Sequence, residues 1–271
     1  MLKKMTASGL FFFLLIPLLS VSDGLAAKGH SRAVVAIDAA TGAILFSQNA
    51  NHRLPPASTT KLIIAIVALE NEPLSKVVTI SRNAAQVEPS KAGFTEGDRI
   101  TVEGLLYAAL MESANDAAVA LAEVVAGSEK QFVQLMNKKA MAIGATNTRF
   151  VNPHGLPRAG QHTTALDLSK IMNCAMSYPK LREIVGTPET QIATEGGKTF
   201  FLRSTDKLLW SDGKMIGGKT GYTRKARHCF VGAARNETKT VIVALLGSPS
   251  RKRLWAEAEK LITRALHGTT A

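Results

Sequence analysis

The sequence predicts a single α/β domain with a helical lobe inserted between two groups of strands. Strand patterns occupy both ends of the chain, while the middle third has the pattern of helices. The 271 residues are 46% hydrophobic and 20% charged, an ordinary globular composition that argues against intrinsic disorder. No internal repeat and no linker rich in Pro, Gly or Ser divides the chain, so we expect one domain over residues 27–271.

Residues 1–26 are set apart because they have the pattern of a secretory signal peptide. Lys3 and Lys4 form a basic start, an apolar stretch runs from Leu10 to Val21, and small residues around Ala26 offer a cleavage site. The apolar stretch is shorter than the roughly 20 residues of a membrane span, so no stable transmembrane anchor is expected. We expect export to the periplasm or the cell-wall space.

The chain is strongly basic, with 33 Lys and Arg, 21 Asp and Glu, and a formal net charge of +12. Such a surface favours polyanions: nucleic acid, anionic lipid or an acidic wall polymer. Export argues against nucleic acid as a partner and favours the envelope. Removal of the signal peptide takes away Lys3, Lys4 and Asp23, which leaves a net charge of +11.

The first elements follow from apolar runs and turn residues. An apolar run from Ala33 to Ile37, a turn at 38–42 and a second run to Phe46 predict a hairpin over 32–47. Pro55 and Pro56 place a loop at 51–57. A helix is then expected from about Ser58 to Glu70.

The remaining elements follow in two groups. Helices are expected at 102–111, 115–126, 128–143 and 165–185, with a loop rich in Gly and Pro at 144–162. Strands are expected at 187–194, 198–203, 227–235 and 239–246, before a final helix from Ser250 to Leu266.

Cysteine and histidine patterns exclude several kinds of site. Two Cys cannot form a disulfide-dense scaffold. Cys174 and Cys229 are expected to be buried thiols, although export permits a disulfide between them. None of the six His has the spacing of a metal site, so neither a metal nor another cofactor is expected. The nucleophile elbow G-x-S-x-G is absent.

The first chemical pattern is Ser58-Thr59-Thr60-Lys61 at the start of a buried helix. Residues i and i+3 share a helix face, so Lys61 can reach the Ser58 hydroxyl. A neutral Lys61 could take the hydroxyl proton, which needs a pKa drop of about 3 units. Burial and a neighbouring cation both lower a lysine pKa. The alternative is a helix-capping serine followed by a surface lysine.

Two further patterns follow in the chain. Ser113-Ala114-Asn115 precedes a helix. Its hydroxyl could relay a proton beside Lys61, and its amide could hold the lysine ammonium or a substrate carbonyl. The alternative is a serine that caps the helix, or an ordinary loop asparagine. Lys219-Thr220-Gly221 leads into a strand, where Lys219 would supply the second cation and Thr220 would bind a substrate carboxylate. Gly221 would let an extended substrate approach the strand. The alternative for this third pattern is a basic turn.

The three patterns in this order resemble those of the low-molecular-mass penicillin-binding proteins, the D-alanyl-D-alanine carboxypeptidases of serine peptidase family S11. The likeness covers residues 30–266. It is supported by Pro-Pro-Ala before Ser58, by Asn-Pro-His-Gly-Leu at 152–156 and by the segment 217–223, of which 152–156 is interpreted as scaffold. One departure is Asp206, which adds a charge where the family usually has Asn and puts local substrate contacts in question.

The resemblance implies a β-lactamase/DD-peptidase-like α/β fold, with an antiparallel sheet covered by helices and an inserted all-helical lobe. It implies Ser58 as the acylated nucleophile, Lys61 as the general base and Ser113 as the proton shuttle. Substrate binding falls to Asn115, Lys219, Thr220, Gly221 and Tyr222, with the backbone N–H groups of Ser58 and Tyr222 as the oxyanion hole. The expected partners are peptidoglycan stem peptides and β-lactams, which would inhibit covalently.

The resemblance implies removal of the terminal D-alanine from stem peptides through a Ser58 acyl-enzyme. A D,D-endopeptidase that cleaves cross-links is the nearest alternative, since the same motifs serve both. A class A β-lactamase is disfavoured because no E-x-x-L-N pattern lies between Asn115 and Lys219. A β-lactam-binding protein without turnover is disfavoured by the intact motifs.

Overall fold

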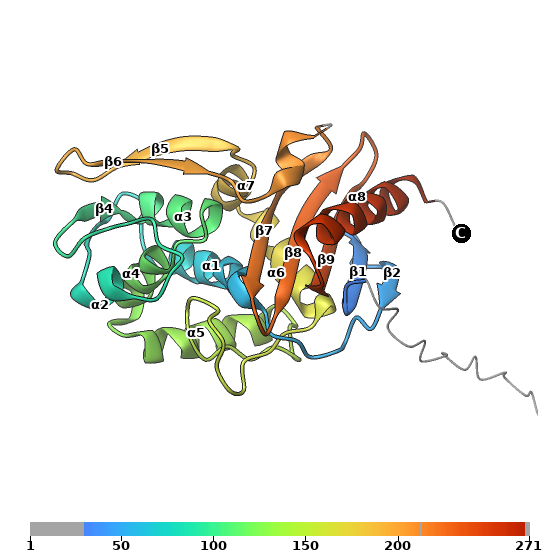
Figure 1. Cartoon of the computed structure of the whole chain (residues 1–271), viewed down its shortest axis with the longest axis horizontal. Helices are drawn as coiled ribbons and strands as arrows, with labels where there is room; N and C mark the ends of the chain where they lie inside the picture. Colours follow the sequence, from blue (N-terminus) through green and yellow to red (C-terminus); the bar gives the residue numbers. More distant parts are fainter. Residues whose placement is uncertain (1–29, 212, 269–271) are drawn as a thin grey trace, which may run out of the picture.

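The computed structural model describes residues 30–211 and 213–268, so the predicted signal peptide lies outside the described residues. Its centre is a five-stranded antiparallel sheet (Figure 1). In spatial order the strands are β2 (Ile44–Gln48), β1 (Ala33–Asp38), β9 (Thr240–Ser248), β8 (Arg227–Arg235) and β7 (Met215–Thr223). Both ends of the chain therefore meet in one sheet.

Both faces of this sheet are buried, as β9 illustrates. Val241, Val243 and Leu245 point into a smaller hydrophobic cluster, whereas Ile242 and Ala244 point into the main core. Side chains alternate between the two faces of a strand, so a sheet covered on both sides requires a continuous apolar run. The sequence of β9, TVIVALLGS, is such a run.

One helix covers each face of the sheet (Figure 1). α8 (Arg251–His267) packs on β9, β8 and β1 and closes the smaller cluster. Its start is capped by Ser250, whose Oγ accepts the Arg253 N–H. α6 (Ala165–Ser177) packs on the opposite face and contributes to the main core.

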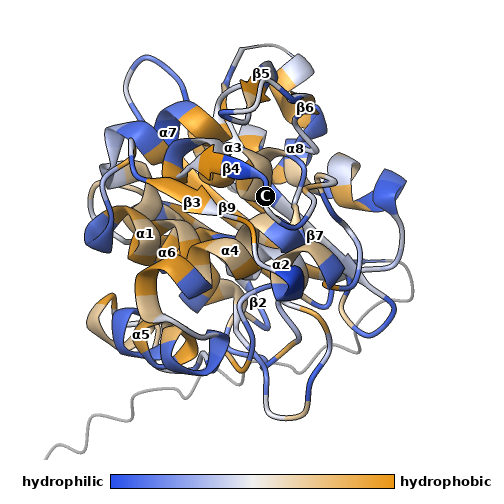
Figure 2. Ribbon diagram, turned by 90° about the vertical axis from the view of Figure 1, so that its left-hand side faces the viewer, coloured by the Kyte–Doolittle hydropathy of each residue, from blue (hydrophilic) through white to orange (hydrophobic). Residues whose placement is uncertain are grey.

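The main core continues from α6 into a helical lobe. The lobe comprises η1 (Ala57–Thr60), α1 (Lys61–Asn71), β3 (Val77–Thr79), α2 (Arg82–Gln86), β4 (Arg99–Thr101), α3 (Val102–Met111), α4 (Asn115–Ala126) and α5 (Glu129–Ala142). Figure 2 shows hydrophobic residues concentrated on α1, α4 and α6, whereas the outer helix α5 carries both hydrophobic and hydrophilic residues. α1 is buried from Lys61 to Ala68, so it forms the axis of the lobe.

The chain returns to the sheet through short elements beside the lobe. These are α7 (Pro179–Val185), β5 (Glu189–Ala193), β6 (Thr199–Arg203) and η2 (Lys207–Trp210). The β5–β6 hairpin extends over α3 (Figure 1). After the hairpin, η2 lies next to β7, whose outer edge pairs with no strand among the described residues.

Most predicted elements are confirmed, and three predictions need correction. The helix expected at 165–185 is two helices, because Pro179 cannot continue the hydrogen bonding of α6 and begins α7 instead. The helix expected from about Ser58 starts as the 3₁₀ turn η1, which contains Ser58, and becomes the α-helix α1 only at Lys61. Lys219-Thr220-Gly221 does not lead into a strand; it lies in the middle of β7, which the predicted strands omit.

Cys174 and Cys229 are both free thiols in the structure. Cys229 is buried, Cys174 is half-buried, and the two are not bonded to each other. Burial raises the pKa of the Cys229 thiol to about 12, so it is inert as a nucleophile at neutral pH. Within 30–211 and 213–268, no helix is long and apolar enough to cross a membrane.

Candidate active site

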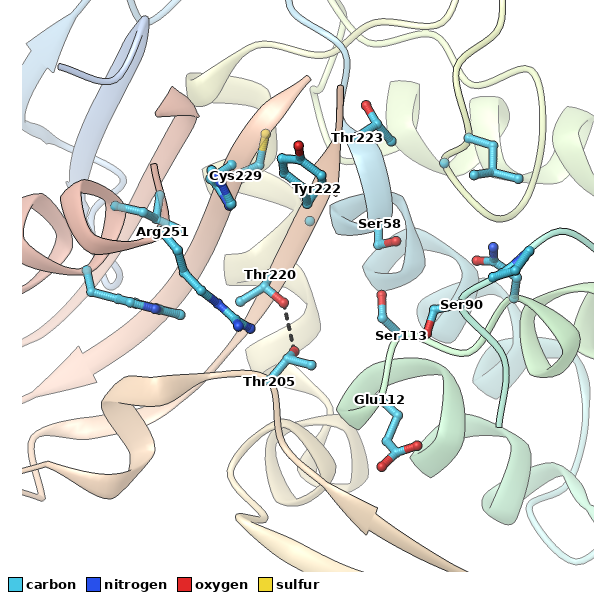
Figure 3. Close-up of a pocket in the computed structure, with 18 residues that line it drawn as sticks. Ser58, Ser90, Glu112, Ser113, Thr205, Thr220, Tyr222, Thr223, Cys229 and Arg251 are labelled. Atoms are coloured by element: carbon cyan, nitrogen blue, oxygen red, sulfur yellow. Dashed lines mark hydrogen bonds between the residues drawn. The ribbon is translucent and has the colours of Figure 1, made fainter. Parts of the chain in front are cut away.

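A cavity of about 400 Å³ lies between β7 and the helical lobe (Figure 3). Its walls come from η1, the loop between α3 and α4, β7 and the start of α8. Six of the predicted site residues line it: Ser58, Ser113, Asn115, Thr220, Gly221 and Tyr222. The other two, Lys61 and Lys219, have no exposed surface and lie directly behind this wall.

Ser58 and Lys61 are brought together by the 3₁₀ geometry of η1. In a 3₁₀ turn residues i and i+3 eclipse each other, which places the two side chains one above the other. The Lys61 Nζ lies 3.2 Å from the Ser58 Oγ. The preceding residue, Ala57, has a φ of +49° and is fully buried, so the turn is held by its surroundings rather than by local preference.

Lys61 is fixed by three acceptors in a fully buried position. Besides the Ser58 Oγ, its Nζ donates to the Asn115 Oδ1 at 2.6 Å and to the His154 carbonyl at 3.0 Å. Burial lowers the pKa of Lys61 well below its usual value, and the Lys219 cation lowers it further, while Asp116 opposes both effects. A lysine that gives up its proton this readily can act as a base toward Ser58.

Ser113 connects the second lysine to the cavity. The Lys219 Nζ donates to the Ser113 Oγ at 2.9 Å and to the Thr220 carbonyl at 3.1 Å. Ser113 has a φ of +65°, a conformation that non-glycine residues seldom adopt, and this aims its hydroxyl toward Ser58 (Figure 3). A hydroxyl between a nucleophile and a cation is suited to passing a proton.

Lys219 and Asp206 are both buried behind the cavity, where each charge acts on the pKa of the other without an ion pair within 4.0 Å between them. Burial lowers the pKa of Lys219 to about 7, although the Asp206 charge acts in the opposite direction. Burial also raises the pKa of Asp206 to about 7, against the hydrogen bond from the Leu208 N–H and the charge of Lys219. Asp206 has no exposed surface and does not line the cavity, so its charge acts through Lys219 rather than by touching a ligand.

Hydroxyl groups and one arginine form the rim of the cavity next to β7. The Thr220 and Thr205 Oγ1 atoms lie 2.7 Å apart, and Arg251 extends from the start of α8 toward both of them (Figure 3). These are the groups that a carboxylate in the cavity would meet first. Direct contact of Lys219 with a ligand stays a prediction, because Ser113 and Thr220 stand in front of it.

Gly221 is needed for the close packing of β7 against η1, in addition to the approach of a substrate expected from the sequence. A Cβ on this residue would lie 2.9 Å from the Ser58 backbone N and 3.0 Å from the Ala57 Cβ. The missing side chain therefore lets β7 lie against η1 and keeps the Ser58 N–H open to the cavity. The next residue, Tyr222, is 55% exposed, with its ring 4.5 Å from that of His228.

The segment 152–156, interpreted as scaffold, touches the catalytic groups directly. Its His154 carbonyl accepts from Lys61. Gly155 has a φ of +85°, and a Cβ there would lie 2.0 Å from the Ala57 carbonyl oxygen. The Asn152 side chain closes the loop by accepting the Gly155 N–H and donating to the Leu156 carbonyl. The loop thus holds both Lys61 and the turn that carries Ser58.

Several residues of the cavity have no signal in the sequence. Arg251 and Trp255 come from the last helix, Glu112 from the end of α3 and Ser90 from a loop. Thr205 is adjacent to the departure noted at Asp206, which was the one available hint. No group of three or more His, Cys, Asp or Glu in the described part of the chain could hold a metal ion.

A serine beside a buried lysine of lowered pKa, in a fold with an antiparallel sheet and a helical lobe, is the arrangement of enzymes that transfer acyl groups through a serine ester. A sequence model described as D-alanyl-D-alanine carboxypeptidase, peptidase family S11, matches residues 22–250. The chain belongs to this family.

Individual proteins agree with the family model. The chain is 32% identical over 238 residues to D-alanyl-D-alanine carboxypeptidase DacF of Bacillus subtilis, covering 86% of this chain and 61% of that protein. It is 33% identical to a D-alanyl-D-alanine endopeptidase of Pseudomonas aeruginosa, over 85% of this chain and 76% of that protein. The crystal structure of a D-alanyl-D-alanine carboxypeptidase from Mycobacterium tuberculosis is similar with a TM-score of 0.82 and 33% identity, covering 87% of this chain and 90% of that one.

Proposed function

We propose that this protein is a serine D-alanyl-D-alanine carboxypeptidase of the cell envelope, which removes the terminal D-alanine of peptidoglycan stem peptides. The observation that carries the proposal is the contact between Ser58 and the buried Lys61. The family, the Bacillus relative and the crystal structure from Mycobacterium tuberculosis, all described as D-alanyl-D-alanine carboxypeptidases, support it. The chain spans 61% of the length of the Bacillus relative.

Acylation begins when Lys61 takes the Ser58 proton. The Ser58 Oγ then bonds to the penultimate D-alanine carbonyl carbon, and the carbonyl electrons move to its oxygen. The backbone N–H groups of Ser58 and Tyr222 stabilise this oxyanion, an interaction for which one donor is typically worth about 10²- to 10³-fold in rate. The absence of a Cβ on Gly221 leaves room for the oxyanion beside the Ser58 N–H.

The second half of the reaction releases D-alanine and then the shortened peptide. The amide C–N bond breaks as the leaving nitrogen takes a proton from Lys61 through Ser113. Thr220, Thr205 and Arg251 hold the terminal carboxylate, with the Lys219 charge behind them. Water then attacks the ester carbon and gives a proton to Lys61; the bond between that carbon and the Ser58 Oγ breaks, and the Oγ takes the proton back from Lys61. A β-lactam would acylate Ser58 in the same way but would keep its leaving nitrogen attached through the ring.

The proposal also covers the cellular location of the enzyme and the bounds of its signal peptide and catalytic domain. Residues 1–26 are a signal peptide, residues 27–271 are the catalytic domain, and the enzyme works in the periplasm or the cell-wall space. The high positive charge suits a protein beside an anionic wall.

Digestion of purified muropeptides by the mature protein, with products weighed by mass spectrometry, tests the proposal. We expect pentapeptide stems to lose one D-alanine and β-lactams to label Ser58. Both results depend on acylation of Ser58. If β-lactams label Ser58 but every muropeptide stays intact, the protein binds penicillin without being a carboxypeptidase, and the proposal is wrong.

Replacing Asp206 by Asn tests the effect of the buried Asp206 charge on Lys219. Removing the carboxylate removes the charge that raises the pKa of Lys219, so that pKa falls below about 7 and the cation is lost at lower pH. We expect the alkaline limb of kcat/KM to move to lower pH, with KM raised and kcat little changed. Asn keeps an oxygen for the Leu208 N–H, so the melting temperature should hold. A pH profile that coincides with that of the wild type would contradict an effect of the Asp206 charge on Lys219.

A further inference from the structure

No residue of the β5–β6 hairpin lines the catalytic cavity, but the base of the hairpin is bonded to residues next to Ser113. The backbone N–H of Arg203 donates to the Glu112 Oε1 at 3.2 Å. The N–H of Thr205, just beyond β6, donates to the Met111 carbonyl at 3.1 Å. From this base the hairpin lies along α3, with its tip next to β4 (Figure 1). The base therefore supports the loop that carries Ser113.

The tip of the hairpin is bonded to a second part of the cavity wall, the loop of residues 87–98 between α2 and β4. This loop supplies Ser90 to the wall. At the tip, the Lys198 Nζ donates to the Gly93 carbonyl at 3.1 Å and forms an ion pair with the Asp98 Oδ2 at 3.0 Å. One ammonium group thus holds the 87–98 loop at two points.

Two aromatic rings pack at the same junction. Phe94 of the loop is buried and meets Phe200 of β6 edge to face, with 4.7 Å between the ring centroids. The Lys198 Nζ lies 4.9 Å from the centroid of the Phe200 ring, so the ring also attracts the ammonium. The Lys198 side chain is 42% exposed, and exposed ion pairs contribute little to the stability of a whole domain. Its contacts therefore fix a loop rather than support the core.

The opposite side of the loop is held by Asp116, a carboxylate with no exposed surface. Its oxygens accept the backbone N–H groups of residues 92–94 at 2.9 to 3.2 Å. The N–H of Gly93 thus bonds to Asp116, while the carbonyl of Gly93 bonds to Lys198. The loop is held from α4 by a negative charge and from the hairpin by a positive one.

Asn115, the residue before Asp116, depends on this loop for its orientation. Its backbone N–H donates to the Ser90 carbonyl and its Nδ2 donates to the Glu88 carbonyl, both at 2.8 Å. The oxygen and the nitrogen of an amide point in different directions, so the Nδ2 bond decides where the Oδ1 points. The Oδ1 accepts the Lys61 Nζ at 2.6 Å. The position of the loop therefore helps to set the position of the catalytic amine.

We propose that Lys198 is a positioning residue of the Ser58 site: it keeps the 87–98 loop against α4, and the loop keeps the Asn115 amide oxygen on Lys61. The inference rests on the proposed function, although the acylation step that it concerns also occurs with β-lactams. Lys198 touches no reacting atom. Without its ammonium the loop is held from one side alone, so the amide and the amine have more than one position and the Ser58 proton is removed less often.

The test replaces Lys198 by Met, which keeps a straight side chain over the Phe200 ring and removes the ammonium. Stopped-flow acylation by a chromogenic β-lactam at increasing concentration separates the limiting rate constant from the concentration that gives half of it. We expect the limiting rate constant to fall about 5- to 30-fold, because a small displacement of a catalytic group slows the reaction without preventing it. For D-alanine release from a pentapeptide, kcat/KM should fall by a similar factor.

The half-saturating concentration of the β-lactam should change by less than about twofold in Lys198→Met. The groups that would hold the carboxylate are Thr220, Thr205 and Arg251, and none of them contacts Lys198 or the 87–98 loop through a hydrogen bond. A loss in the rate constant alone therefore separates positioning from ligand binding.

Two further variants separate positioning from a general disturbance of the hairpin. Lys198→Arg keeps a cation for Asp98 and N–H donors for the Gly93 carbonyl, so it should acylate within about threefold of the wild type. Glu195→Gln is the matched control. It breaks another exposed ion pair of the same tip, the 3.1 Å contact with Arg99 of β4, and leaves the Lys198 contacts in place. It should acylate like the wild type.

Hydrogen exchange followed by mass spectrometry reports on the loop itself. In Lys198→Met we expect peptides that cover 87–98 to exchange faster, whereas peptides from α1 and β7 should exchange as in the wild type. The melting temperature should hold to within a few degrees, because the lost ion pair is exposed.

Three results would overturn the role of Lys198. The first is a Lys198→Met protein that acylates like the wild type. The second is a loss of the same size in Glu195→Gln or in Lys198→Arg, which would mean that any change at the tip disturbs the site. The third is a higher half-saturating concentration with an unchanged limiting rate constant, which would place Lys198 in ligand binding. A wild type that β-lactams acylate but that releases no D-alanine would instead contradict the carboxypeptidase proposal, and the acylation rates would still decide the role of Lys198.

Discussion

Ser58→Ala is expected to abolish acylation by penicillin and to lower D-alanine release by about 10⁴- to 10⁶-fold, the loss typical of removing a catalytic serine. No other hydroxyl is placed to replace it, because the lysine base contacts the Ser58 Oγ alone among the hydroxyls of the cavity. Labelling with fluorescent penicillin and mass analysis of the intact protein measure the first effect. Release of D-alanine from a pentapeptide measures the second.

Ser90→Ala is the matched control for Ser58→Ala. Ser90 also lines the cavity, but its contact with the site is through its backbone carbonyl, which accepts the Asn115 N–H at 2.8 Å. The alanine variant keeps that bond and should acylate within a few-fold of the wild type. A Ser58→Ala protein that still binds penicillin covalently would place the nucleophile elsewhere and would remove the mechanism.

Lys61→Met is expected to slow acylation by about 10²- to 10⁴-fold, the usual contribution of a general base. Methionine fills similar space in a fully buried position, so the fold should survive even though the Asn115 Oδ1 and the His154 carbonyl each lose a donor. Stopped-flow acylation by a chromogenic β-lactam gives the rate, and the melting temperature reports the fold.

Lys61→Arg separates the base from the charge. Arginine keeps a cation near Ser58 but stays protonated at every accessible pH, so it cannot take the serine proton. We therefore expect it to be as slow as Lys61→Met. Rapid acylation by the arginine variant would mean that position 61 contributes charge only and that another group deprotonates Ser58.

The local sequence predicts the bounds of a helix or strand correctly where the residues of that element determine them. The bounds of α3, α4 and β8 match the predictions because capping residues and apolar periodicity mark them. β7 was missed because three glycines give it the appearance of a turn. Their reason is tertiary: a Cβ on Gly217 would lie 2.4 Å from the Val185 carbonyl oxygen, and one on Gly218 would lie 2.6 Å from the Phe230 ring.

The site residues, too, fall into those that short motifs in the sequence predict and those that only the folded chain brings together. The lysines and hydroxyls that carry short motifs were found, since their spacing has a chemical meaning. Arg251 and Thr205 were not, because only the folded chain brings the start of α8 next to η2 and β7. The deep burial of Lys219 and Asp206 is likewise a property of the assembled core, which no spacing along the chain expresses.

The open edge of β7 has a consequence for self-association. An unpaired strand edge normally invites the edge of another sheet, a common start of aggregation. Here η1 and the loop before α4 stand along that edge and leave a slot between the lobe and the sheet. We therefore expect the slot to admit a single extended peptide but not a second sheet, so that the lobe that supplies Ser58 would also hinder copies of the molecule from joining at β7.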